Sequence, residues 1–162
     1  MDLSASWPYL EEVARRRLAH NKTERHVSDY GPEIETLGAA GELAARRFLG
    51  MIETLHESFD GGADLIWRGW RVDVKATHLT PKVDHRFLQW PENKPIKADI
   101  ILMTAIDLKH KTGVVMGYAF AGEIIAASVN YNRDYPCFEI PITQLHPAWE
   151  LVVPGRYAPS RN

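Results

Sequence analysis

The sequence predicts an α/β fold in which a mixed central sheet is flanked by helices. A helical repeat of apolar residues runs through the first third of the chain, an alternating repeat follows around a short turn, and then comes a continuous apolar run. This order of helix, hairpin, strand, strand and helix favours helices packed on a sheet. With 162 residues, 45% of them apolar, the chain fits a single domain over residues 1–162.

Two helices are expected before the sheet. Pro8 suits the first turn of a helix, and apolar residues recur at helical spacing after it. The polar stretch Asn21–Tyr30 is expected to be a linker, so that about residues 1–30 form an N-terminal helix and linker. Pro32 opens a longer helix, which Gly50 ends or bends. Its predicted apolar stripe consists of Ile34, Leu37, Gly41, Ala45, Phe48 and Ile52.

A β-hairpin is expected next. Ala63–Trp67 and Trp70–Lys75 alternate as strands do, and Arg68-Gly69 is a plausible two-residue turn between them. The apolar run Ala98–Ile106 predicts a strand that is buried on both faces.

The remaining segments are assigned from turn residues and apolar runs. Leu79–Lys97 carries three prolines and is expected to be irregular. Val114–Phe120 predicts another strand, Glu123–Ser128 a short helix and Cys137–Ile142 a last strand. A mobile tail is expected over about residues 154–162.

The composition limits the possible partners and compartment. The net charge of −2 and the pI of about 6.4 mean that any contact with nucleic acid must use a local basic patch. Cys137 is the only cysteine, and no stretch has the length and apolar composition of a bilayer span. We therefore expect a cytoplasmic protein without a membrane partner.

The pattern with chemical meaning is an Asp followed by an acid-x-Lys element. The chain contains three such elements, Asp73-Val74-Lys75, Glu92-Asn93-Lys94 and Asp107-Leu108-Lys109. The second lies between prolines in the segment expected to be irregular, which offers a metal little pre-organisation. The third has Asp99 upstream, but both acids lie at the ends of one predicted strand, roughly 26 Å apart at 3.3 Å per residue. The first element is therefore preferred.

The hairpin brings a second acid to the first element. With the turn at Arg68-Gly69, Asp64 lies opposite Asp73, with their β-carbons about 5 Å apart, and Lys75 shares that face. Like charges in opposite positions destabilise a hairpin, and a divalent cation between them would remove the conflict. Two other interpretations remain: the acids are solvated, or Lys75 neutralises the pair without doing chemistry.

Glu42 is the candidate third acid. On a helical wheel it lies about 90° from the middle of the apolar stripe, where a carboxylate can point along the sheet. It could equally form an i,i+4 pair with Arg46.

Gly41-Glu42 in a helix, Gly61-Gly62-Ala63-Asp64 and Asp73-Val74-Lys75-Ala76-Thr77 together resemble the PD-(D/E)XK, or restriction-endonuclease-like, nuclease superfamily. The resemblance covers about residues 32–77, and Ala63 departs from the proline that often precedes the first Asp. It implies that Asp64 and Asp73 bind Mg²⁺, with Mn²⁺ as a substitute, helped by the Val74 carbonyl and by Glu42. It also implies that Lys75 orients and helps to deprotonate the attacking water. The expected catalytic set is thus Asp64, Asp73, Lys75 and Glu42.

The expected substrate is nucleic acid, with DNA preferred over RNA. The segment Lys75–Lys97 carries five Lys and Arg residues against two acids and could contact phosphate. The basic segment Arg15–Arg25 could do the same, but a solvated helix face is the preferred interpretation there. The residues expected to contact nucleic acid are Arg46, Thr77, Lys82 and Arg86. A homodimer is compatible with cleavage of both strands. The alternative function is a non-catalytic module that binds nucleic acid or protein and retains the nuclease fold.

Overall fold

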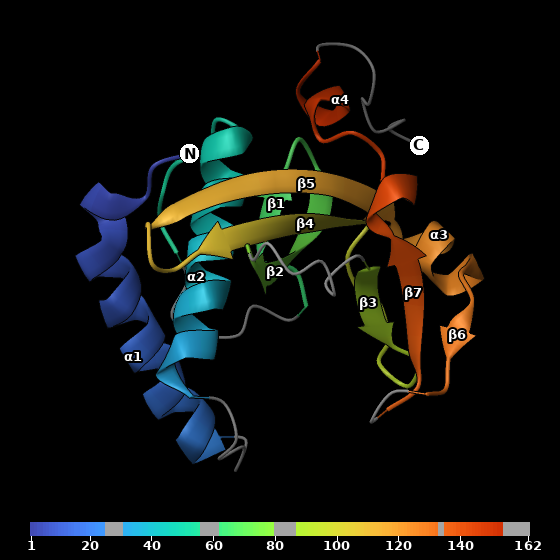
Figure 1. The fold of residues 1–162 in the computed structure, drawn as a ribbon, viewed down its shortest axis with the longest axis horizontal. Helices are drawn as coiled ribbons and strands as arrows, with labels where there is room; N and C mark the ends of the chain where they lie inside the picture. The colour runs from blue at the N-terminus through green and yellow to red at the C-terminus, as the bar shows by residue number, and fades with distance from the viewer. Residues whose placement is uncertain (25–30, 56–61, 80–86, 133–134, 154–162) are drawn as a thin grey trace.

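The computed structural model describes residues 1–24, 31–55, 62–79, 87–132 and 135–153 (Figure 1). Its main sheet has the strand order β1-β2-β4-β5, in which β2 and β4 are parallel and the other neighbours antiparallel. These strands are β1 (Leu65–Trp67), β2 (Trp70–His78), β4 (Ile100–Asp107) and β5 (Thr112–Phe120). The predicted mixed sheet with flanking helices is therefore confirmed.

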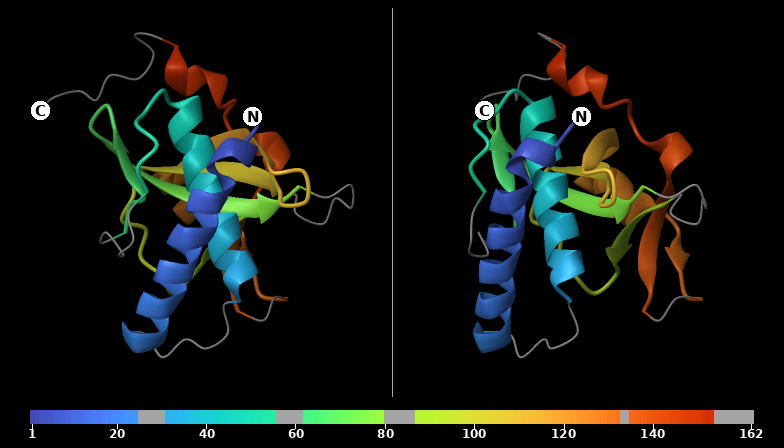
Figure 2. Two further views of the ribbon diagram at one scale, coloured as in Figure 1. Left: turned by 90° about the vertical axis from the view of Figure 1, so that its left-hand side faces the viewer. Right: turned by 60° about the vertical axis from the view of Figure 1, so that its left-hand side comes forward.

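Two helices lie on one side of this sheet (Figure 2). Helix α2 (Pro32–Phe48) packs against the sheet, and α1 (Trp7–Glu24) packs against α2. Gly41 permits the close approach of α2, because a β-carbon there would lie only 2.6 Å from Ala76 Cβ and 2.7 Å from Thr104 Oγ1. Helix α1 includes the start of the stretch that was expected to be a linker, and residues 25–30 lie outside the described residues.

The predicted apolar stripe of α2 is only partly right. Leu37, Gly41 and Ala45 are buried, but Ile34 is 47% exposed and Ile52 lies beyond the helix end with 82% exposure. Leu43, which the stripe omitted, is fully buried in a cluster with residues of α1. A single stripe fails here because α2 is covered on two sides, by the sheet and by α1.

The predicted hairpin turn is confirmed, and so is the register of its three pairs, but the predicted placement of Asp64 directly opposite Asp73 is not part of the ladder, because the Asp64 N–H donates to the Val72 carbonyl. Arg68 and Gly69 have φ values of +48° and +86°, and positive values at both central residues suit the tight turn that joins twisted strands. Trp67 pairs with Trp70, and Leu65 with Val72. Strand β1 starts at Leu65 instead of Ala63, so Asp64 comes immediately before the strand.

A second sheet packs against the opposite face of the main sheet. It has the order β3-β7-β6, with strands β3 (Phe87–Pro91), β7 (Cys137–Pro141) and β6 (Val129–Asn130). The expectation that Leu79–Lys97 is irregular is wrong for β3, because Pro91 lies at the end of an edge strand, where a missing N–H is tolerated. Residues 80–86 lie outside the described part.

Strand β4 is buried between these two layers, as predicted. Leu102 contributes to the core on one face, and Ile101 and Met103 pack with residues of the second sheet on the other. Because Asp73 pairs with Ile101 and Lys75 with Met103, these two residues of β2 lie on the face turned toward the second sheet.

The remaining elements are short. They are the 3₁₀ helices η1 (Ser4–Ser6) and η2 (Ile142–Gln144) and the helices α3 (Ala121–Ala126) and α4 (Trp149–Val152). Helix α3 begins earlier than predicted, and the predicted tail over 154–162 lies outside the described residues. Among the helices of the described ranges, none combines the length and the apolar composition that a membrane span needs.

Candidate functional site

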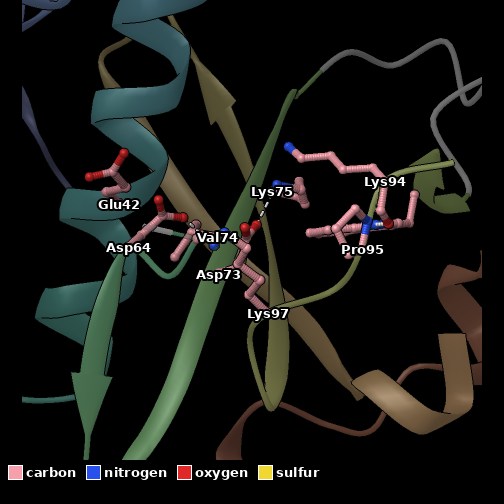
Figure 3. A pocket seen from close by; sticks show the side chains of 10 residues that line it. Glu42, Asp64, Asp73, Val74, Lys75, Lys94, Pro95 and Lys97 are labelled. Carbon is pink, nitrogen blue, oxygen red and sulfur yellow. Dashed lines mark hydrogen bonds and ion pairs between the residues drawn. The ribbon is translucent and has the colours of Figure 1, made fainter. Parts of the chain in front are cut away.

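A pocket of about 280 Å³ lies where α2, the hairpin and the segment after β3 meet. Glu42 and Asp64 lie on one side of Val74, and Asp73 lies on the other side with three lysines (Figure 3). The lining residues are Glu42, Gly62, Asp64, Asp73, Val74, Lys75, Trp90, Lys94, Pro95 and Lys97. The pocket therefore contains all four residues that the sequence predicted as catalytic.

Asp64 is positioned by hydrogen bonds to β2, because β1 starts only at the next residue, Leu65. The Val74 N–H of β2 donates a 2.5 Å hydrogen bond to Asp64 Oδ2, in the place where a longer β1 would have supplied a backbone acceptor. The Asp64 N–H donates to the Val72 carbonyl at 2.9 Å. Because the N–H and C=O of one strand residue point to the same edge, the Val74 carbonyl faces the edge that Asp64 occupies.

Arg46 forms a hydrogen bond with the backbone of Asp64. Its Nη2 donates a 3.0 Å hydrogen bond to the Asp64 carbonyl oxygen, and the residue is only 7% exposed. This burial does not suit the predicted phosphate contact, which requires a guanidinium on the surface. Arg46 instead stabilises the backbone at Asp64 through this hydrogen bond.

Asp73 and Lys75 lie together on the opposite side of Val74 (Figure 3). The Lys75 ammonium forms an ion pair with Asp73 Oδ1, and Asp73 is 7% exposed. Lys75 Nζ also lies 4.6 Å from the centroid of the Trp90 ring, within the range of a cation–π interaction. Lys75 is thus held between its carboxylate partner on β2 and an aromatic ring of the second sheet.

Glu42 has a partner that the sequence did not indicate. Arg17 of α1 donates from Nη1 to Glu42 Oε1 at 2.6 Å and from Nη2 to Glu42 Oε2 at 2.8 Å. Only 16% of the Arg17 side chain and 10% of the Glu42 side chain are exposed. The proposed i,i+4 pair with Arg46 is therefore replaced by a bidentate pair between the two helices.

Burial and neighbouring charge raise the pKa of Asp64 from 3.8 to about 7. Burial is the largest cause, followed by repulsion from the carboxylates of Glu42 and Asp73. The hydrogen bond from Val74 and the charge of Lys75 act in the opposite direction. Without a metal ion, the protonated form of Asp64 is therefore favoured below neutral pH.

This raised pKa predicts a pH-dependent stability. Between pH 4 and 7 the unfolded protein ionises Asp64 while the folded protein keeps its proton, so folding loses stability as the pH rises. Asp64→Asn removes this loss and keeps an oxygen that can accept from Val74. We expect the variant's free energy of unfolding, relative to wild type, to increase from pH 4 to pH 7 and then level off. Urea unfolding in the presence of a chelator measures it, and a difference that does not change with pH would refute the assignment.

The donor set fits a hard divalent cation. Asp64 and Asp73 line the pocket on the two sides of Val74, and their carboxylates with the Val74 carbonyl would offer only oxygen ligands, which suit Mg²⁺ or Mn²⁺. Repulsion between the carboxylates, visible in the raised pKa of Asp64, is a conflict that a cation would relieve. Within the described residues, no group of three His, Cys, Asp or Glu side chains is arranged to hold a metal ion. A cation site would therefore use Asp64, Asp73 and the Val74 carbonyl, because Glu42, which was predicted as a further ligand, is paired with Arg17.

Three other residues were predicted to contact nucleic acid, and the structure describes one of them. Thr77 is half-buried on β2, on the face of Asp73 and Lys75, but does not line the pocket. Lys82 and Arg86 lie outside the described residues.

Sequence reasoning missed several pocket residues. Lys94 belongs to the acid-x-Lys element that was rejected as a loop, and that loop returns to the pocket because β3 leads into it. Gly62 has a φ of +108°, and Lys97 packs on it so closely that a β-carbon there would lie 2.7 Å from Lys97 Cδ. Trp90, and Arg17 which contacts Glu42, carried no sequence signal, since their partners are distant in the chain.

Comparisons with protein-family models, with curated proteins and with solved structures find no significant match. The proposed function therefore depends on the pocket itself.

Proposed function

We propose that this protein is a metal-dependent nuclease of the restriction-endonuclease-like, PD-(D/E)XK kind, and that it hydrolyses phosphodiester bonds, in DNA by preference. The observation that carries the proposal is the convergence of Asp64, Asp73 and Lys75 in one pocket on a hairpin. The order of α2, the hairpin, β4 and β5 is compatible with this type of fold.

Each residue has a separate role in the proposed reaction. Asp64, Asp73 and the Val74 carbonyl would hold Mg²⁺ or Mn²⁺. When bound, the ion would polarise the phosphate and stabilise the leaving oxygen. Lys75 would orient the attacking water through a hydrogen bond, which requires that its ion pair with Asp73 loosens as the metal neutralises the carboxylate. To act as the base it would first have to release a proton to solvent, and as the neutral amine it would then accept the proton of the water.

The charges of the pocket suit a phosphodiester substrate. Lys94 and Lys97 line the pocket with Lys75, on the side of Asp73, and both are exposed. A phosphate placed between a cation on the acids and these ammonium groups would meet positive charge from two directions. This local arrangement allows a protein with a net charge of −2 to bind a polyanion.

A second candidate is a non-catalytic binding module with the same fold. The ion pairs Asp73–Lys75 and Glu42–Arg17 favour it, because they neutralise two of the three pocket acids without a metal. In that case the pocket would stabilise the hairpin and the two helices, and the protein would bind nucleic acid equally well with or without divalent cations.

Cleavage assays on a panel of substrates separate the two candidates. The panel contains linear, nicked, branched and single-stranded DNA and a single-stranded RNA, each labelled, with Mg²⁺, Mn²⁺ or a chelator. We expect cleavage of at least one DNA in Mn²⁺, none in chelator, and none by Asp73→Asn under any condition. Binding without cleavage of any substrate, or equal cleavage by wild type and Asp73→Asn, would reject the nuclease proposal.

A further inference from the structure

The Arg17–Glu42 pair joins the outer helix α1 to the acidic side of the pocket. Both carboxylate oxygens of Glu42 accept from one guanidinium, which is the strongest geometry available to such a pair. Glu42 lines the pocket next to Asp64, and its charge acts on Asp64. The positive charge of Arg17 also reaches Asp64. Arg17 therefore influences the acids without lining the pocket.

We infer that Arg17 is a positioning residue that holds Glu42 beside the metal site and prevents it from becoming a metal ligand. This inference rests on the proposed nuclease function and deepens it by assigning the control of metal affinity. Exchange of this guanidinium for a cation is unfavourable for Glu42, since the buried guanidinium would lose both hydrogen bonds of its bidentate pair.

The Arg17–Glu42 pair limits the number of carboxylates on the ion, which suits phosphodiester hydrolysis. Mg²⁺ usually binds through one or two carboxylates and keeps its other positions for water and substrate phosphate. With Glu42 held by Arg17, Asp64 and Asp73 are the two carboxylates, and positions remain for a phosphate and the attacking water. A third carboxylate would bind the ion more tightly, reduce its positive charge and occupy a position that the substrate needs.

Arg17→Met tests this directly, because it removes the guanidinium but keeps much of the apolar stem. Titration of free Mn²⁺ by electron paramagnetic resonance, without substrate, gives the dissociation constant. We expect it to fall by at least about tenfold, because Glu42 is released and a nearby positive charge is lost. At saturating Mn²⁺, the single-turnover cleavage rate should fall rather than rise.

Two further variants keep the result interpretable. In Glu42→Gln the change Arg17→Met should have much less effect, about threefold or below, since the freed side chain is no longer a carboxylate. Arg15→Met is the matched control, because Arg15 is on the same helix and pairs with the exposed Glu12; its Mn²⁺ affinity should equal that of wild type. Circular dichroism confirms that each variant is folded.

The outcomes separate this inference from the proposed function. If wild type binds Mn²⁺ but folded Arg17→Met binds it equally or more weakly, the inference is wrong and the metal site stands. An equal tightening in the Glu42→Gln background would also overturn it, because the effect would not pass through Glu42. If wild type binds no Mn²⁺, both the metal site and this inference fail together.

Discussion

Replacement of Lys75 by alanine should slow cleavage by about 10² to 10⁴ while Mn²⁺ binding and folding remain nearly intact. The reason is a division of work: the carboxylates hold the ion, and the ammonium acts on the water and on the charge that develops at phosphorus. Lys75 is suited to this, because Asp73 and the Trp90 ring fix its position at the pocket. Single-turnover cleavage of labelled DNA at saturating Mn²⁺ measures the loss.

The controls for Lys75 follow from the structure. Lys75→Arg should not restore activity, since a guanidinium is bulkier and does not exchange a proton near neutral pH. Lys109→Ala should keep full activity, because Lys109 is exposed in the turn after β4 and does not line the pocket. Lys94 is unsuitable as a neutral control, since it lines the same pocket as Lys75. Full activity of Lys75→Ala would exclude the proposed mechanism, whatever the fold.

Local patterns predicted most of the fold. Proline at the start of α2, glycine after its end and two residues with positive φ at the hairpin turn each have a local physical cause. The turn also gave the register of the three pairs nearest to it. The second sheet was harder, because its strands are short and β3 pairs with a strand about fifty residues later. The second buried face of α2 was missed for a similar reason, since it depends on packing against α1.

The site divides in the same way. The shared face of Asp73 and Lys75 follows from the period of two along β2, and the turn brings Asp64 close to them. The expected position of Asp64 directly opposite Asp73 was wrong, because Asp64 lies before β1 and accepts from the Val74 N–H. Trp90 lines the pocket and Arg17 contacts Glu42 through tertiary contacts between residues far apart in the chain, and no local sequence pattern indicates either contact. Arg46 was wrongly predicted to contact nucleic acid, because its spacing from Glu42 suggested an exposed helix surface. The residue is buried and donates a hydrogen bond to the Asp64 carbonyl.

Binding of Mg²⁺ or Mn²⁺ should stabilise the folded protein through Asp64 and Asp73. An ion that binds only the folded state adds about 2.7 kcal/mol at one hundred times its dissociation constant. Here it would also relieve the repulsion that raises the pKa of Asp64. Asp64→Asn and Asp73→Asn should each abolish the response. Glu11→Gln, which removes an exposed carboxylate of α1 outside the pocket, should leave it unchanged.

The most direct test of the metal site is therefore urea unfolding of these four proteins at pH 7.5, with chelator and with rising Mg²⁺ or Mn²⁺. The account predicts that the free energy of unfolding increases with the logarithm of metal concentration in wild type and Glu11→Gln, and stays flat in Asp64→Asn and Asp73→Asn. A flat response in wild type across millimolar concentrations of both ions, or an equal increase in all four proteins, would contradict it.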